Sequence, residues 1–214
     1  MRQEPDEIPV DPDWPDWAEI VQLMRDARAA ERGYANYWHW PLDRRVAERE
    51  VVRVLREYLV QSGERVDGQI SSVSPDPPDA LLKTKSWRCL GIEVTELVDP
   101  TVVARHRYRK QHHLPVAYDW AEWSREAAAD ALSRLVAIKD RKLAKATANY
   151  DELMLAIFTD EPVFDENFAR AVVATARCTS KIIGRAFLLV SYQPGTDQRI
   201  YPDGCPVLPI ELLK

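Results

Sequence analysis

The sequence predicts an α/β sandwich built around a mixed β-sheet. Helical and strand patterns follow one another in the order helix, strand, hairpin, helix, strand, helix, strand. The segments 153–158 and 186–192 are apolar without alternation, which is typical of strands covered on both faces. The hairpin at 78–97 adds an antiparallel pair to these strands.

The composition is that of a soluble globular protein. The chain has 214 residues, which suits one domain with at most a small appendage. Its net charge of −5 excludes a globally basic nucleic-acid binder, so nucleic-acid binding would need a local patch. The three distant cysteines form no disulfide framework or zinc spacing, and we expect a cytoplasmic protein. No apolar run is long enough to span a bilayer, so we expect no membrane partner.

Residues 1–42 are expected to form an N-terminal arm ahead of an α/β domain over 43–214. The first 19 residues hold seven acids, one base and four prolines, a pattern that favours an extended segment. A short helix should follow from Asp16 to about Glu31. The aromatic cluster at 34–41 could stack on nucleic-acid bases, but a small satellite core or a dimer contact is the favoured interpretation.

A helix is predicted over 43–62, with Asp43 as its N-cap and Gly63 after its end. Glu48 lies inside the apolar stripe of this helix. A carboxylate on an apolar face must be paired or bound to a cation, because burying it alone costs several kcal/mol. Two interpretations of Glu48 are open: an ion pair with Arg44 and a role as a metal ligand. The stripe is formed by Ala47, Val51, Leu55 and Tyr58.

The hairpin at 78–97 carries two acids that should face each other. Asp79 and Glu93 lie seven residues before and after Ser86, so a turn centred there places their Cβ atoms roughly 5 Å apart. Side chains alternate along a strand, so Glu93 should point away from the core face that carries its apolar neighbours. Two such carboxylates suit a hard divalent cation between them. The simpler interpretation is a pair of solvated acids on the outer face of an amphipathic hairpin.

A long helix is predicted over 119–149, and one lysine falls inside its apolar stripe. Lys139 projects about 20° from Leu132 on the helical wheel, and Lys142 lies at the edge of the stripe. A lysine at such a position either extends to the surface or reaches a polar site beneath the helix.

A basic segment follows the hairpin. Residues 105–113 hold four Arg or Lys and three His, without an acid. Such a segment attracts phosphate groups, although a solvated run of charge is the simpler interpretation. The candidate nucleic-acid contacts are Arg105, Arg107, Arg109 and Lys110. The other predicted elements are a strand at 64–73, a helix at 165–178 and a proline-containing edge strand near the C-terminus.

Three features together resemble the PD-(D/E)xK nuclease superfamily. They are Glu48 on the first core helix, Pro78-Asp79 at the start of a strand, and Glu93-Val94-Thr95 on the next strand. The resemblance covers roughly residues 43–160 and implies a restriction-endonuclease-like α/β/α sandwich. It also implies that Glu48, Asp79, Glu93 and the backbone carbonyl of Val94 hold Mg²⁺ or Mn²⁺.

The sequence departs from the family at one catalytic position. The family has a lysine two residues after the Glu, where this chain has Thr95. Some members take this lysine from a neighbouring helix, which makes Lys139 the first substitute and Lys142 the second. The resemblance implies metal-dependent hydrolysis of phosphodiester bonds in nucleic acid, with DNA as the expected substrate and a homodimer as a common state. The alternatives are an inactive module that binds DNA or a partner protein, and an unrelated α/β protein whose acids lie on the surface.

Overall fold

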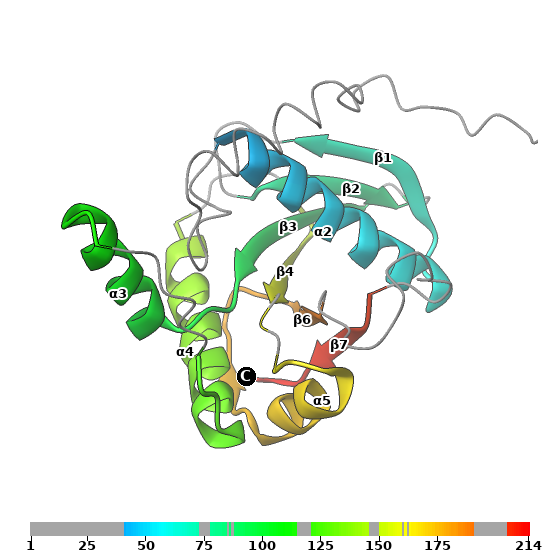
Figure 1. The fold of residues 1–214 in the computed structure, drawn as a ribbon. Helices are drawn as coiled ribbons and strands as arrows, with labels where there is room; N and C mark the ends of the chain where they lie inside the picture. Colours follow the sequence, from blue (N-terminus) through cyan, green and yellow to red (C-terminus); the bar gives the residue numbers. More distant parts are fainter. Residues whose placement is uncertain are drawn as a thin grey trace, which may run out of the picture.

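A computed structural model gives the architecture of most of the chain. It describes residues 41–72, 78–84, 86, 88–114, 121–145, 150–159, 161, 163–190 and 205–214. Within these ranges the protein is α/β, with helices on both sides of a mixed sheet (Figure 1). The α/β class predicted from the sequence is confirmed. Residues 1–40, which hold most of the predicted N-terminal arm, its short helix and all of the 34–41 cluster except Pro41, lie outside the described residues.

The sheet of the described ranges has the strand order β1-β2-β3-β4-β6-β7. β3, β4 and β6 run parallel in its centre, and the outer neighbours β2 and β7 pair antiparallel with them. The parallel strands must be joined by crossovers, which the helices between them supply. The bounds are β1 Val66–Ser72, β2 Ala80–Thr84, β3 Cys89–Glu96, β4 Glu152–Thr159, β6 Arg185–Val190 and β7 Val207–Ile210.

Helix α2, Pro41–Gln61, covers one face of the sheet (Figure 1). It begins two residues before the predicted start, so Asp43 lies in its first turn and is not the N-cap. Proline suits the first position of a helix because its missing N–H would have no partner there. Gly63 ends the helix as predicted, with a φ of 90° that favours glycine. The apolar side of α2 packs on this face through Val51, Val52, Leu55 and Leu59.

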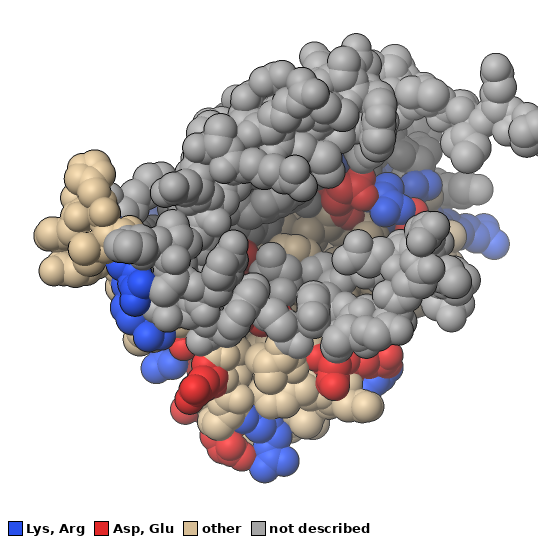
Figure 2. Space-filling view, viewed as in Figure 1, with Lys and Arg blue, Asp and Glu red and all other residues tan. Residues whose placement is uncertain are grey.

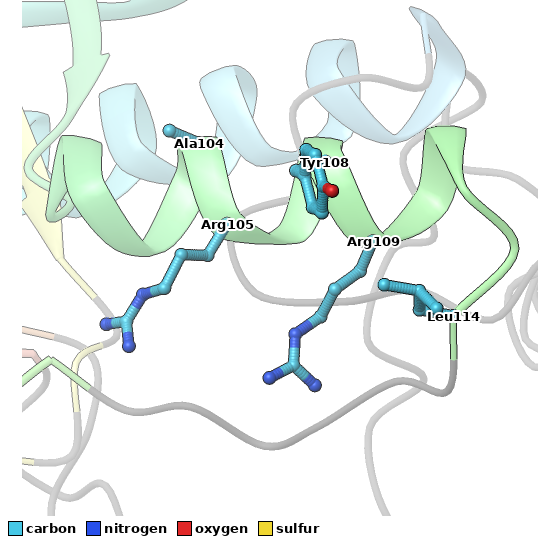
Figure 3. Close-up of a pocket in the computed structure, with 5 residues that line it drawn as sticks. All are labelled: Ala104, Arg105, Tyr108, Arg109 and Leu114. Carbon is cyan, nitrogen blue, oxygen red and sulfur yellow. The ribbon is translucent and has the colours of Figure 1, made fainter.

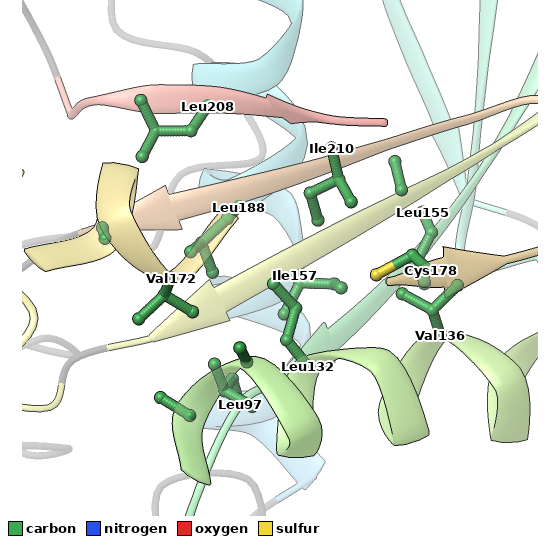
Figure 4. Close-up of a cluster of buried hydrophobic side chains, with 14 of the residues drawn as sticks. Leu97, Leu132, Val136, Leu155, Ile157, Val172, Cys178, Leu188, Leu208 and Ile210 are labelled. Carbon is green, nitrogen blue, oxygen red and sulfur yellow. The ribbon is translucent and has the colours of Figure 1, made fainter. Parts of the chain in front are cut away.

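Helices α4, Arg125–Leu143, and α5, Glu166–Thr175, cover the opposite face. Both begin at a side-chain cap: Ser124 accepts from the N–H of Ala127, and Asp165 accepts from the N–H of Phe168. Both helices are shorter than predicted: α4, expected over 119–149, begins after Ser124 and ends at Leu143, and α5, expected over 165–178, ends at Thr175. Figure 4 shows the core between α4 and the sheet, where Leu132 and Val136 face the strands.

The apolar strand β4 divides its side chains between the two cores. Leu155 and Ile157 belong to the cluster under α4 and α5, and Met154 and Ala156 belong to the cluster under α2. The prediction of a strand covered on both faces is therefore confirmed for β4. The expected edge position of the C-terminal strand is also confirmed, because β7 pairs only with β6 within the described ranges.

One helix was not predicted. Helix α3, Pro100–Gln111, coincides with the basic segment and stands out from the body in Figure 1. Asp99 begins it by accepting hydrogen bonds from the N–H groups of Thr101 and Val102. The apolar pattern of the sequence did not predict α3, because Val102 is its one residue in the buried core of the described ranges. The short strands β5, Cys178–Thr179, and β8, Leu212–Leu213, form a separate pair.

Candidate functional site

The β2–β3 hairpin has the register predicted from the sequence. Ala80 pairs with Ile92 and Leu81 with Gly91, so the next position along brings Asp79 opposite Glu93. Asp79 stands just before β2. Its Oδ2 atom accepts a hydrogen bond of 2.7 Å from the backbone N–H of Val94. This bond ties the Asp79 carboxylate to β3, one residue beyond Glu93.

Glu93 points away from α2 and toward α4. Its neighbours Ile92 and Val94 lie in the core under α2, and strand alternation turns Glu93 to the other face. The side chain is 1% exposed. The interpretation of Glu93 as a solvated acid on the outer face of the hairpin is therefore wrong. Glu93 lies between the sheet and α4.

Two lysines of α4 meet this buried carboxylate. The Nζ atom of Lys139 lies 2.6 Å from Oε1 of Glu93, and the Nζ atom of Lys142 lies 3.7 Å from the same oxygen. Lys139 is 15% exposed and Lys142 is 53% exposed. The first ammonium group is therefore largely removed from water, whereas the second remains at the mouth of the site.

Helical geometry explains how Lys139 comes to lie there. It follows Leu132 by two turns and Val136 by three residues, so it shares the buried side of α4 with them. Because its stem is apolar, Lys139 can pack beside these residues while its ammonium group reaches Glu93. Of the two alternatives that the sequence left open for Lys139, the structure shows the contact with a polar site under the helix.

The second oxygen of Glu93 lacks a partner. Oε2 is buried and accepts no hydrogen bond in the described part of the protein. Burying an acceptor without a partner costs about 1–3 kcal/mol, more when the group is charged. Carboxylate oxygens are the ligands that Mg²⁺ prefers. The register places Asp79 opposite Glu93, and a divalent cation between the two stays a prediction.

The third predicted carboxylate does not join this pair in the structure. Among the described residues, no three His, Cys, Asp or Glu side chains form a group that could hold a metal ion. Glu48 is half-buried on α2, whose apolar side packs on the sheet face opposite to the one from which Glu93 projects. The roles of Glu48 and of the Val94 carbonyl as metal ligands stay predictions. Thr95 lies in β3 two residues after Glu93, on the same side of the strand.

No family model, curated protein or solved structure matches this chain. The resemblance to the PD-(D/E)xK superfamily therefore stays a prediction from the residues of the sequence. None of the helices in the described ranges is long and apolar enough to cross a membrane. The three cysteines are free thiols.

The predicted nucleic-acid contacts lie on α3. Arg105 is exposed and Arg109 is half-buried, and both side chains extend from the same side of the helix (Figure 3). The side chains of Arg107 and Lys110 lie outside the described set. Figure 2 shows blue Lys and Arg surface beside the protruding end of the molecule that α3 forms in Figure 1.

Sequence reasoning missed Glu161, which is 1% exposed just after β4. Burial raises the pKa of Glu161 to about 7, and the nearby backbone N–H of Asp99 opposes this shift. Neither carboxylate oxygen has the geometry of a hydrogen bond. An acid in the string Thr-Asp-Glu-Pro resembles an ordinary loop residue, so the sequence carries no signal for this burial.

Proposed function

We propose that this chain is a metal-dependent nuclease that hydrolyses phosphodiester bonds in nucleic acid, with DNA as the substrate. The observation that carries the proposal is the 2.6 Å contact between Lys139 Nζ and Glu93 Oε1. The sequence lacks the lysine expected two residues after Glu93, and the contact supports Lys139 as its replacement. The α/β/α layers and the mixed sheet support a restriction-endonuclease-like fold.

Each residue of the site has a distinct part in this proposal. Asp79 and Glu93 supply the carboxylate oxygens for Mg²⁺ or Mn²⁺, which when bound polarises the phosphate and lowers the pKa of a water. Lys139 fixes the orientation of the Glu93 carboxylate through Oε1 and leaves Oε2 open. It also places a positive charge where negative charge develops on the phosphate. Lys142 is more exposed and can contact a phosphate as the substrate enters.

The direct test is a cleavage assay with matched variants. Wild type, Glu93→Gln and Lys139→Met are each incubated with Mg²⁺ or Mn²⁺ and with plasmid, linear duplex or single-stranded DNA. We expect cleavage by wild type that both substitutions abolish. Glu126→Gln and Lys145→Met are the controls, because these residues are exposed elsewhere on or beside α4. Thermal unfolding must show that each variant is folded. Absence of metal-dependent cleavage by wild type on every substrate would overturn the proposal.

One observation favours a second function, an inactive nuclease-fold module that binds DNA or a partner protein. Thr95 occupies the position where the family has its catalytic lysine. Calorimetric titration with Mn²⁺ separates the two functions. A catalytic site should bind the ion and lose that binding in Asp79→Asn, whereas a binding module need not bind it. The third interpretation, in which the acids are all surface residues, conflicts with the burial of Glu93.

A further inference from the structure

The end of α3 has a defined local structure that sets the positions of its side chains. His113 adopts a φ of 52°, the left-handed conformation that commonly follows a helix. The N–H of Leu114 then donates to the carbonyl of Arg109 at 3.0 Å, a bond that spans five residues as in a Schellman motif. This turn directs Leu114 back along the helix, and its side chain lies beside that of Arg109 in Figure 3.

A hollow of about 720 Å³ lies along this flank of the helix. Arg105 and Arg109 are one helical turn apart and extend from α3 in the same direction (Figure 3). No acid occurs within Pro100–Gln111. The charge of Arg105 also helps to lower the pKa of Asp99 at the start of the helix. Two guanidinium groups at this spacing carry charge that complements neighbouring phosphates. The hollow is lined by Ala104, Arg105, Tyr108, Arg109 and Leu114.

An aromatic ring stands between the two arginines in sequence. Tyr108 is 58% exposed, which is high for a large aromatic side chain. Its ring stacks on His112 with a centroid distance of 4.0 Å and an interplanar angle of 28°. Nδ1 of His112 lies 2.8 Å from the carbonyl oxygen of Tyr108, so this nitrogen donates and fixes the imidazole ring. The stack therefore holds Tyr108 in one orientation while much of its ring faces solvent.

We propose that this surface, formed by Arg105, Tyr108, Arg109 and Leu114 and here called the α3 platform, binds single-stranded DNA by stacking an unpaired base on Tyr108. Arg105 and Arg109 contact the phosphates on either side of that base. An exposed ring flanked by arginines suits a single strand because the faces of bases inside a duplex are already stacked on their neighbours. The inference rests on the proposed action on nucleic acid and names its substrate class.

Binding is measured without cleavage. A short fluorescent single strand and the duplex of the same sequence are titrated with the full chain in EDTA, and fluorescence anisotropy gives the two affinities. We expect the single strand to bind more tightly. Tyr108→Ala should weaken that binding by on the order of 5- to 150-fold, which corresponds to the roughly 1–3 kcal/mol lost when one base-stacking aromatic is removed. Tyr108→Phe keeps the ring and should bind within about 2-fold of wild type, because stacking needs no hydroxyl group.

The arginines are tested through the salt dependence of binding. Removal of one phosphate contact lowers the slope of log affinity against log salt by about 0.7 for a single strand. We expect this for Arg105→Ala and for Arg109→Ala. Arg125→Ala is the matched control, since Arg125 is an exposed arginine of α4 that pairs with Glu126. Its slope and affinity should stay at the wild-type values.

Two results would overturn the α3 platform: equal affinity for the single strand and the duplex, or unchanged single-strand affinity in folded Tyr108→Ala. Neither result depends on catalysis. Failure of cleavage with intact, Tyr108-dependent binding would refute the nuclease alone. Cleavage that survives in Tyr108→Ala with unchanged binding would refute the platform alone.

Discussion

Lys139 and Glu93 are 46 residues apart in sequence and in direct contact across the interface between α4 and the sheet, with Nζ 2.6 Å from Oε1. The carboxylate is 1% exposed and the lysine 15% exposed. Charges removed from water to this extent are stable only while both partners are present, because each offsets the desolvation of the other. Loss of either partner would therefore leave a buried charge without compensation.

Removal of the lysine should destabilise the protein. Lys139→Met leaves Glu93 buried with a more distant partner in Lys142, and we expect a loss on the order of 3 kcal/mol in the free energy of unfolding. Urea denaturation at neutral pH measures it. The double variant Lys139→Met/Glu93→Gln should recover part of the loss, because the unpaired charge is gone. Equal stability of Lys139→Met and wild type would show that the contact has no energetic importance.

The buried Glu161 should make stability depend on pH. Its pKa is raised by burial from 4.5 to about 7, so the folded state holds a proton that the unfolded state releases. The contribution of Glu161 to stability is therefore highest below pH 4.5, falls as pH rises, and levels off above pH 7, with a total loss of up to about 3 kcal/mol.

Glu161→Gln is the test of this dependence. The amide stays neutral at every pH, so the variant should gain stability over wild type progressively between pH 4.5 and pH 7. Chemical denaturation at a series of pH values measures the difference. A difference that is constant across this window would contradict the prediction.

Asp140 should stabilise the protein with a pH dependence opposite to that of Glu161. It accepts hydrogen bonds from Ser180 Oγ and from the backbone N–H groups of Lys181, Ile182 and Ile183. Burial alone would raise its pKa, but these bonds favour the charged form and the pKa of Asp140 lies below 3.8. Its contribution is therefore complete above pH 3.8 and is lost as pH falls through the lowered pKa.

Substitution of Asp140 tests this contribution to stability. Asp140→Ala should cost about 2 kcal/mol of unfolding free energy at neutral pH, within the range for hydrogen bonds to a charged group. The loss should shrink at low pH, where the wild-type carboxylate is protonated. Asp130→Ala is the control, since Asp130 is an exposed acid of the same helix. A loss that does not change with pH would contradict the role assigned to the charge.

Gly91 should be required for the geometry around Asp79. A Cβ atom at this position would lie 3.1 Å from the ring of Tyr150 and 3.2 Å from Pro78. Pro78 directly precedes Asp79, so Gly91→Ala should displace the start of β2 and destabilise the protein by about 1–3 kcal/mol. Thermal unfolding measures the loss, and Mn²⁺ titration reports on the site. Wild-type stability and Mn²⁺ binding in this variant would show that Tyr150 and Pro78 shift to accommodate the Cβ atom without disturbing the site.

Several features of this protein follow from local sequence alone. The register that brings Asp79 opposite Glu93 depends only on a turn centred near Ser86, and the structure has it. The inward position of Lys139 depends only on the helical repeat, and α4 presents it as expected. Helix ends did not follow from the local pattern, since α4 begins after Ser124 and α5 ends at Thr175.

The tertiary structure decided which of these local features meet. Only the packing of α4 on β3 shows that Lys139 lies over Glu93, since the partners come from elements whose arrangement no local pattern specifies. A separate core places α2, with Glu48, against the opposite face of the sheet. Burial of Glu161 also depends on distant chain, because an acid after a strand has the same local pattern whether water or protein covers it. Periodicity is a property of neighbours in sequence, whereas contact and burial are properties of the whole fold.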